Sequence, residues 1–404
     1  MMETYCRALM LMNHQIGRRQ FLGTVASALA FSQLPGSWLW AQAATPSSSV
    51  VDFIHNEIVT GSFPGAGLLV FQNGKLVLEH FEGTYCSSTV RDNPMKRDVT
   101  HMLYSFSKGV SATVVAIARQ KKLIDFDAPL STYIPGYKGE WKDETTIRHL
   151  LTHTAGIPNI PLGTVYTEEE WQKAVETCCA AKVEWKPGSR SEYHARSAMF
   201  LAAEAVRSRI AGRPSWESIC REWLLDPIGA TTLSFLIPTS GAVSITPQPK
   251  ELPKPLNPAT VGMAGQPGGG AFGKLDDMIK VLQLHLNGGT WEGKVILERE
   301  SWAEMHRIQY REQILQAQAE NRKPDHEPFA LGWKLKLNQK GDGFGVGDQT
   351  PEGTFGHAGI WTLMGMGFPQ KQGAMAFIST NPPTLPNLSR IRNGITDRVY
   401  DSLR

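Results

Sequence analysis

The sequence predicts an α+β fold, in which helices flank an antiparallel β-sheet built from both chain ends, with an inserted, mostly helical region. The first observation is a pair of apolar runs at residues 67–72 and 75–81. They flank Asn73-Gly74, which is a strong signal for a β-hairpin. The second is a set of short strand-like runs near the C-terminus, bounded by Gly, Pro and Asn. Helical patterns lie between the two regions, so we expect the two chain ends to share one sheet.

The other elements follow from local patterns in chain order. Residues 50–60 place Val51, Ile54 and Ile58 on one face of a short helix. Residues 83–100 are polar and loop-like. Further helices are expected at 105–119, 146–158, 167–181, 195–212, 273–287, 300–320 and 386–403, and further strands at 330–337, 361–368 and 374–380.

A long proline-rich segment interrupts this pattern. Residues 237–270 carry seven prolines and end in three glycines, which predicts a surface loop. Such a loop often shapes a binding cleft, although a variable insertion without a role is the plain alternative. We expect one domain over 50–404, with a sheet region at 50–105 and 290–404 and a helical region at 106–289.

The composition is that of an ordinary globular protein, with 41% hydrophobic and 20% charged residues in a chain of 404. The formal net charge is +3, and residues 1–43 account for two of these charges. We find no basic patch interleaved with aromatic residues, so nothing favours nucleic acid as a partner. After residue 43 no stretch is apolar for long enough to span a bilayer, so we expect no transmembrane span in the mature protein.

The N-terminus has the pattern of an export signal. Residues 17–23, GRRQFLG, form a twin-arginine pattern, and residues 21–31 form a modest apolar core. The small-residue sequence AQA at 41–43 is typical of a cleavage site. We therefore expect residues 1–43 to be a twin-arginine signal peptide and the protein to be periplasmic or secreted. The long segment before the arginines suggests that translation begins at Met12.

The cysteines are more typical of buried core residues than of a metal or redox site. The sequence contains no C-x-x-C, which speaks against a zinc site. An exported protein can form disulfides, but adjacent cysteines rarely pair with each other. We interpret these cysteines as mostly buried small hydrophobic residues. One disulfide is possible, but the sequence does not predict which cysteines would form it. These cysteines are Cys86, Cys178, Cys179 and Cys220.

The most informative stretch opens the apolar helix at 105–119. Ser105 and Lys108 stand three residues apart, so they share one helical face. A lysine in an apolar setting loses its proton more readily and can activate a serine hydroxyl as a nucleophile. An S-x-x-K also occurs by chance, and the interpretation depends on this helix and on partners downstream.

Two further stretches could complete a site. Tyr193 follows a Pro-Gly turn and could share a proton with Lys108, although a core aromatic is as good an interpretation from spacing alone. His357 precedes a predicted strand, in Gly-His-Ala-Gly, where the glycines would let a substrate approach the backbone. His149 and His153 have the i, i+4 spacing of a metal pair, but no acidic ligand lies between them. We therefore expect structural histidines and no metal.

Taken together, these motifs resemble those of the serine β-lactamase and penicillin-binding-protein superfamily, in its class C-like branch, which also holds periplasmic esterases and D-amino-acid peptidases. The resemblance covers roughly residues 50–400. The matching segments are residues 105–108, 148–158, 187–193, 269–277 and 357–359.

The resemblance implies a β-lactamase/transpeptidase-like fold and a serine hydrolase that needs no cofactor. Ser105 would be the acylated nucleophile, Lys108 its general base and Tyr193 a group that assists proton transfer. The oxyanion hole would be the backbone N–H groups of Ser105 and Ile360. Residues 357–360, with His357 and Gly359, would contact the substrate.

Two departures from the family pattern bear on the substrate. The second motif, usually Tyr-x-Asn, is YHA at 193–195, and the third, often Lys-Thr-Gly, is HAG at 357–359. The missing lysine and threonine would help to hold a substrate carboxylate. His357 would supply at most a pH-dependent charge. We therefore expect neutral esters or amides to fit better than β-lactams, and the pKa of Lys108 to be lowered less than in close relatives.

The sequence thus predicts a secreted serine hydrolase that cleaves a small-molecule ester or amide, or a cell-wall-derived substrate, through an acyl-enzyme. One alternative is a β-lactamase or D,D-peptidase. Another is a catalytically silent protein that binds cell-wall peptide or glycan, which Ala195 favours. The intact set of Ser105, Lys108 and Tyr193 opposes it, because a silent relative has no chemical need for all three. The oligomeric state stays open.

Overall fold

The computed structural model describes residues 46–87, 90–194, 196–244, 263–340, 344–359, 362–380 and 385–404. The chain divides into two units, Met1–Ala43 and Ala44–Arg404, and every described residue lies in the second. The predicted signal peptide at 1–43 therefore lies outside the described residues.

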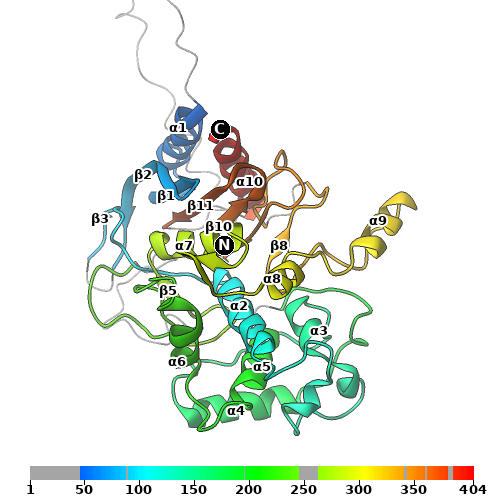
Figure 1. The fold of residues 1–404 in the computed structure, drawn as a ribbon. Coiled ribbons are helices and arrows are strands. Elements are labelled where there is room, and N and C mark those ends of the chain that lie inside the picture. The colour runs from blue at the N-terminus through cyan, green and yellow to red at the C-terminus, as the bar shows by residue number, and fades with distance from the viewer. Residues whose placement is uncertain are drawn as a thin grey trace, which may run out of the picture. The chain divides into compact units, whose positions relative to one another are not determined.

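Within the described residues, a seven-stranded sheet joins the two ends of the chain (Figure 1). Its order is β3-β2-β1-β11-β10-β9-β8, and neighbouring strands run antiparallel. Leu68 on β1 lies opposite Phe377 on β11, which confirms the predicted sheet from both ends. The strands are β1 (Gly65–Gln72), β2 (Lys75–Tyr85), β3 (Asn93–Pro94), β8 (Lys334–Leu335), β9 (Phe355–Ala358), β10 (Met364–Phe368) and β11 (Gly373–Ser379).

Helices cover both faces of this sheet. Strand side chains alternate between faces, so Leu68 and Val70 pack with α1 and α10, whereas Leu69 packs into the core that holds α2 and α7. In Figure 1, α1 and α10 lie together at the end of the domain where the C-terminus is. The helices are α1 (Pro46–Val59), α2 (Phe106–Gln120), α7 (Leu275–Leu286) and α10 (Leu385–Ser402).

The inserted region is helical and surrounds α2, which is buried from Phe106 to Ala118 as the sequence predicted. Two small sheets, β4–β5 and β6–β7, complete the described strands. The remaining elements are α3 (Ile147–Leu151), α4 (Glu168–Ala180), α5 (Ser197–Arg207), α6 (Trp216–Cys220), α8 (Arg299–Met305), α9 (Arg311–Ala319), β4 (His101–Met102), β5 (Phe272–Gly273), β6 (Thr290–Trp291) and β7 (Lys294–Val295), with 3₁₀ turns at Leu130–Thr132, Lys142–Glu144 and Pro369–Lys371 and a π-turn at Arg221–Leu225.

Three predicted elements differ from the structure. The helix expected at 146–158 is only α3, because the chain turns at His153, whose φ of +59° is left-handed. The helix expected at 300–320 is two helices, and the Gln309 N–H between them donates to Phe329 O instead of to a helical carbonyl. The strand expected at 330–337 shortens to β8, just after Gly332 at φ +81°.

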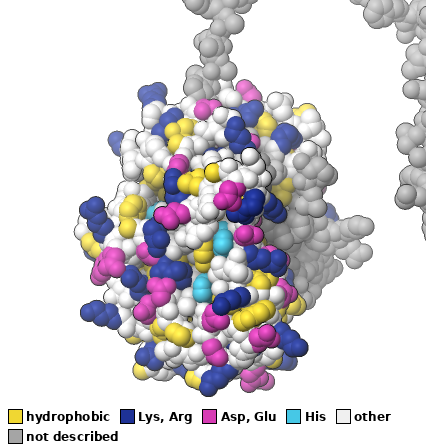
Figure 2. All heavy atoms as spheres, turned by 90° about the vertical axis from the view of Figure 1, so that its right-hand side faces the viewer, with side chains coloured by type: hydrophobic (Ala, Val, Ile, Leu, Met, Phe, Trp, Pro, Cys, Tyr) yellow, Lys and Arg dark blue, Asp and Glu magenta, His cyan; other side chains and the backbone are white. Residues whose placement is uncertain are grey.

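The four cysteines of the described chain are free thiols, and Cys86, Cys178 and Cys220 are buried. This agrees with their interpretation as small hydrophobes. No helix in the described segments combines the length and apolarity needed to cross a bilayer. On the face drawn in Figure 2, basic and acidic side chains are interspersed and do not form a patch of one sign.

Candidate active site

Ser105 stands at the start of α2, directly after a strained residue. Tyr104 has a φ of +45°, which is rare for a residue other than glycine and often marks a functional site. Ser105 occupies the N-cap position of α2 without a side-chain capping hydrogen bond, and it is 7% exposed. One turn later, Gly109 lets the helix pack against Trp333, because a Cβ at Gly109 would lie 2.0 Å from the indole ring. The serine is therefore held on a rigid, buried helix.

The structure brings three of the predicted site residues together. Tyr193 Oη donates a hydrogen bond to Ser105 Oγ over 2.6 Å. Lys108 Nζ lies 3.3 Å from the same Ser105 Oγ and donates to Gly268 O over 2.6 Å. The ammonium also lies 4.9 Å from the centre of the Tyr193 ring. The serine oxygen therefore contacts two groups that can move its proton.

Burial sets the protonation of both groups. Lys108 is fully buried, and this desolvation, with a smaller effect of Arg196, lowers its pKa to about 7. Burial raises the pKa of Tyr193 well above its usual range, against the lowering effects of Ser105 and Arg392. Near neutral pH, Lys108 is therefore neutral in about half of the molecules. Tyr193 keeps its proton.

A Gly-rich turn closes over Lys108. The Gly268 carbonyl accepts from Lys108, and Ser111 Oγ donates to Pro267 O over 2.7 Å. Gly270 has no room for a side chain, because a Cβ there would lie 2.1 Å from Met263 O. The sequence singled out the glycines but not this carbonyl. Residues 245–262 of the predicted loop lie outside the described residues.

The acidic pair after this turn has a structural role. Asp276 forms a two-pronged pair with Arg97. The Asp277 carboxylate accepts from the backbone of Thr232 and Leu233. These contacts fix the start of α7 and direct neither carboxylate to Ser105.

The segment at 357–359 lies at the site, with the His357 side chain buried. His357 is fully buried on β9, with its Nδ1 2.9 Å from Ala358 O. Burial, with a smaller effect of Lys108, lowers its pKa to about 3. His357 is therefore neutral in the physiological range, and the pH-dependent charge that was its upper limit is not available there. Its ring centre lies 5.8 Å from that of Tyr193.

Gly359 packs its backbone against Tyr104. A Cβ at Gly359 would lie 2.9 Å from Tyr104 Cβ, so the close approach requires glycine. The Gly359 N–H donates to Leu363 O over 2.6 Å, and its carbonyl accepts from Arg392. Ile360, predicted to complete the oxyanion hole, lies outside the described residues, as does Ala195.

An aromatic cluster holds Tyr193 in place. Its ring centre lies 4.8 Å from that of His153, 5.6 Å from Phe344 and 6.3 Å from Phe329. The Lys334 ammonium lies 4.6 Å from the Phe329 ring and 4.3 Å from the Phe344 ring. Sequence reasoning named His153 only as a structural histidine and missed Phe329, Phe344 and Lys334, because their spacing carries no signal until the chain is folded.

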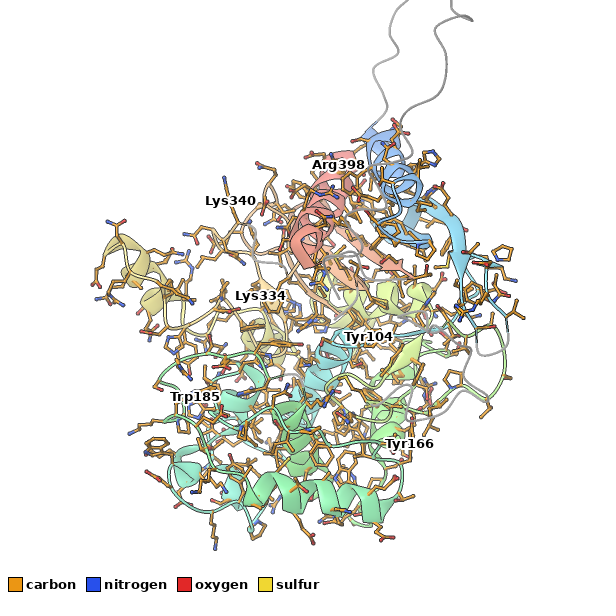
Figure 3. The ribbon with its side chains drawn as sticks, turned by 180° about the vertical axis from the view of Figure 1, so that it is seen from behind. Tyr104, Tyr166, Trp185, Lys334, Lys340 and Arg398 are labelled. Carbon is orange, nitrogen blue, oxygen red and sulfur yellow. The ribbon has the colours of Figure 1, made fainter. Side chains whose placement is uncertain are left out.

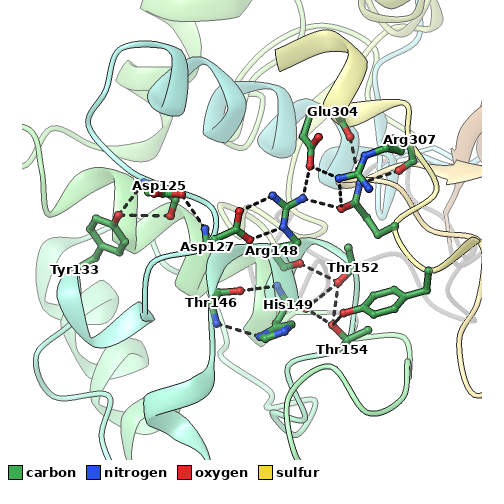
Figure 4. A network of polar contacts seen from close by, with 12 residues as sticks. Asp125, Asp127, Tyr133, Thr146, Arg148, His149, Thr152, Thr154, Glu304 and Arg307 are labelled. Atoms are coloured by element: carbon green, nitrogen blue, oxygen red, sulfur yellow. Dashed lines mark hydrogen bonds and ion pairs between the residues drawn. The ribbon is translucent and has the colours of Figure 1, made fainter. Parts of the chain in front are cut away.

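His149 and His153, which were expected to be structural, each form a hydrogen bond with the backbone. His149 Nδ1 accepts from Thr146 N at the start of α3, and His153 Nδ1 accepts from the N–H of His194. Figure 4 shows His149 in a polar network in which Arg148 binds Asp127. This ion pair ties α3 to the loop that follows α2. No cluster of metal-binding side chains occurs in the described part of the chain.

The charged groups that act on the site are cations. After burial, the charge with most effect on the pKa of Lys108 is that of Arg196, three residues beyond Tyr193. Arg392 acts on both Tyr193 and His357. Positive charge around a nucleophile favours a transition state in which negative charge develops. Sequence reasoning assigned no role to either arginine.

Comparison with known proteins agrees with this fold and indicates a serine hydrolase. The profile of the Beta-lactamase family matches residues 49–396, and the chain belongs to this family. It is 24% identical over 406 aligned residues to a putative D-alanyl-D-alanine carboxypeptidase of Salmonella schwarzengrund, covering 87% of this chain and 90% of the relative. It is also 27% identical over 180 residues to "Esterase/beta-lactamase LipL" of Mycobacterium tuberculosis, covering 45% of this chain and 41% of that protein.

Solved structures share the fold. A family VIII carboxylesterase superposes with a TM-score of 0.68 at 22% identity, covering 89% of this chain and 98% of the other. A penicillin-binding protein homologue from Caulobacter crescentus superposes with a TM-score of 0.70 at 19% identity, with the same coverage. These likenesses establish the fold and leave the substrate to be argued from the site.

Proposed function

We propose that this protein hydrolyses an ester or amide through an acyl-enzyme on Ser105. The observation that carries the proposal is the placement of Ser105 Oγ between Tyr193 Oη at 2.6 Å and Lys108 Nζ at 3.3 Å. A serine hydroxyl needs a neighbouring base to become a nucleophile. Lys108, with its lowered pKa, is suited to that role.

In the proposed acylation step, neutral Lys108 takes the Ser105 proton as Oγ attacks the carbonyl carbon. The carbonyl oxygen gains negative charge and is stabilised by the backbone N–H of Ser105 and, in our proposal, that of Ile360. Tyr193 is protonated and bonded to Ser105 Oγ, so it can pass a proton to the leaving group and recover one from Lys108. Water then attacks the acyl-enzyme by the reverse transfers and releases the acid.

The third motif bears on the substrate. His357 is neutral and buried, and Ala358 offers no side-chain donor, so neither supplies the charge that a carboxylate would need. This favours a neutral ester or amide. The cations Arg196 and Arg392 near the site favour the second candidate, a β-lactamase or D,D-peptidase acting on a carboxylate-bearing substrate. We also propose that the twin-arginine leader exports the protein.

A fluorophosphonate probe tests the proposed nucleophile. We expect mass spectrometry to place the adduct on Ser105 in the wild-type domain, and Ser105→Ala to remain unlabelled. Labelling of neither protein at any pH from about 6 to 10, the range that brackets the Lys108 pKa, would favour the silent binding protein.

Substrates then separate the two enzymatic candidates. We expect hydrolysis of p-nitrophenyl acyl esters to exceed hydrolysis of a chromogenic cephalosporin, with both reactions lost in Ser105→Ala. Faster turnover of the cephalosporin, or of a peptide ending in D-Ala-D-Ala, would establish the second candidate instead.

A further inference from the structure

Lys334, on β8, is a buried cation beside the active site. Its side chain is 2% exposed, and its Nζ donates to the Glu327 carboxylate over 2.6 Å. Figure 3 labels Lys334 on this strand. The register of β8 and β9 places it opposite Gly356, the residue before His357. This lysine therefore lies next to the third motif, although no sequence motif singled it out.

The Lys334 ammonium is connected to Tyr193 through two phenyl rings. It lies 4.6 Å from the centre of the Phe329 ring and 4.3 Å from that of the Phe344 ring. The two rings stand edge to face with their centres 5.6 Å apart, and each also packs against the ring of Tyr193. A cation is attracted to the faces of aromatic rings, so the ammonium favours one orientation of both. Tyr193 therefore packs against neighbours whose orientation Lys334 helps to fix.

Glu327 connects the same lysine to the backbone that carries Tyr193. The Glu327 N–H donates to Ser191 Oγ over 2.7 Å, and the Ser191 N–H donates to Asp325 O over 2.9 Å. These bonds hold the chain two residues before Tyr193. One ion pair therefore joins β8 to the rings beside the tyrosine and to the segment that precedes it.

A charge is a costly way to fill this position. Removing an ammonium from water is unfavourable, and a buried ion pair is often no more stabilising than apolar residues of the same volume. Such a pair can still fix which groups meet. Burial is the main cause that lowers the pKa of His153 and His357, and the Lys334 charge lowers both further. Both histidine rings contact Tyr193, so the charge acts on the immediate surroundings of this tyrosine.

We propose that Lys334 is a positioning residue for Tyr193. By fixing the two phenyl rings and the segment before Tyr193, it keeps the tyrosine hydroxyl 2.6 Å from Ser105 Oγ. Lys334 itself is too deeply buried to contact a substrate. This role rests on the proposed function, in which Tyr193 passes a proton to the leaving group.

The position of Tyr193 can be followed without catalysis. Protein labelled with fluorotyrosine gives a fluorine NMR resonance for Tyr193, which Tyr193→Phe identifies by its absence. Lys334→Met removes the charge and keeps most of the side-chain volume. Lys336→Met is the matched control, because Lys336 is 4% exposed in the same segment and its ammonium binds the backbone carbonyls of Gln339 and Gly347. We expect Lys334→Met to shift or broaden the Tyr193 resonance, and Lys336→Met to leave it unchanged.

Steady-state kinetics with a p-nitrophenyl ester then measures the effect on the reaction. We expect Lys334→Met to lower kcat by about 10- to 100-fold and to change KM by less than about twofold, because a displaced catalytic group slows the reaction more than it weakens binding. In a Tyr193→Phe background, Lys334→Met should lower kcat no further, because the lysine acts only through the tyrosine. Glu327→Gln changes the pair at its 46% exposed end and should have the same effects to a smaller degree.

An unchanged Tyr193 resonance in both Lys334→Met and Glu327→Gln would overturn this role, whatever the activity. So would an unchanged kcat in both variants, an equal loss of kcat in Lys336→Met, or a loss that persists in full in the Tyr193→Phe background. If the wild-type protein hydrolyses no ester, the proposed function fails, and the resonance alone decides whether Lys334 positions Tyr193. If Lys334→Met does not fold, Glu327→Gln provides both measurements.

Discussion

The buried amine of Lys108 predicts a pH dependence of stability that can be measured without a substrate. In the unfolded chain this lysine holds its proton up to its ordinary pKa of 10.5, whereas burial lowers the pKa to about 7 in the folded protein. Between these values the unfolded state binds more protons, so the free energy of unfolding rises with pH. Integrating the linkage relation from pH 7.5 to 8.5 gives about 1.2 kcal/mol from this one group.

Lys108→Met removes the titrating group and keeps most of the side-chain volume. We expect the wild-type protein to gain about 1.2 kcal/mol more stability than this variant between pH 7.5 and 8.5, measured by urea denaturation. The window avoids the buried histidines, whose lowered pKa values matter below about 6.5, and the buried cysteines, whose raised values matter above about 9.

Ser105→Ala is the control, because it retains the lysine and should retain the wild-type slope. Equal slopes in the wild-type protein and Lys108→Met would refute the reasoning, since they would mean that Lys108 keeps an ordinary pKa in the fold.

The remaining predictions concern catalysis and packing. The pH profile of kcat/KM for an ester should rise through pH 7 as Lys108 loses its proton, and Arg196→Met should move the rise to higher pH, whereas Arg196→Lys should not; a profile that is flat from pH 5 to 9 would contradict this. Tyr193→Phe should lower kcat by about 10²–10⁴-fold, as expected for a lost proton-transfer group, while the fluorophosphonate adduct stays on Ser105. An unchanged kcat would exclude proton transfer through Tyr193. Gly109→Ala should lower the free energy of unfolding by about 1–3 kcal/mol in denaturant titrations, because the new methyl group would overlap Trp333; an unchanged midpoint would show that the indole ring moves freely.

The local sequence pattern was sufficient to predict an element where neighbouring residues alone determine that element. The Asn73-Gly74 turn and its flanking apolar runs predicted β1 and β2, and the apolar run after Ser105 predicted the buried helix α2. Helical spacing likewise placed Lys108 one turn beyond the serine, where its amine reaches Ser105 Oγ. These features depend on residues that are neighbours along the chain.

The local pattern was wrong where a distant contact changed a backbone angle. Nothing near His153 in the sequence signals the left-handed φ just after α3. In the structure His153 Nδ1 accepts a hydrogen bond from the backbone N–H of His194, which is distant in the sequence. The predicted single helix at 300–320 is broken where Gln309 bonds to Phe329. Periodicity over a short window contains no information about such partners.

By itself, the sequence determined the class of fold, the family motifs and the set of Ser105, Lys108 and Tyr193, whose side chains meet in the structure. It could not determine their protonation, because a pKa depends on burial and on charges that come from distant segments. Only the tertiary structure placed the Gly268 carbonyl on Lys108, 160 positions away, and enclosed His357 so completely that it stays neutral. The sequence supplied the reactive groups, and the packing of the folded chain decided which of them are neutral and which are charged.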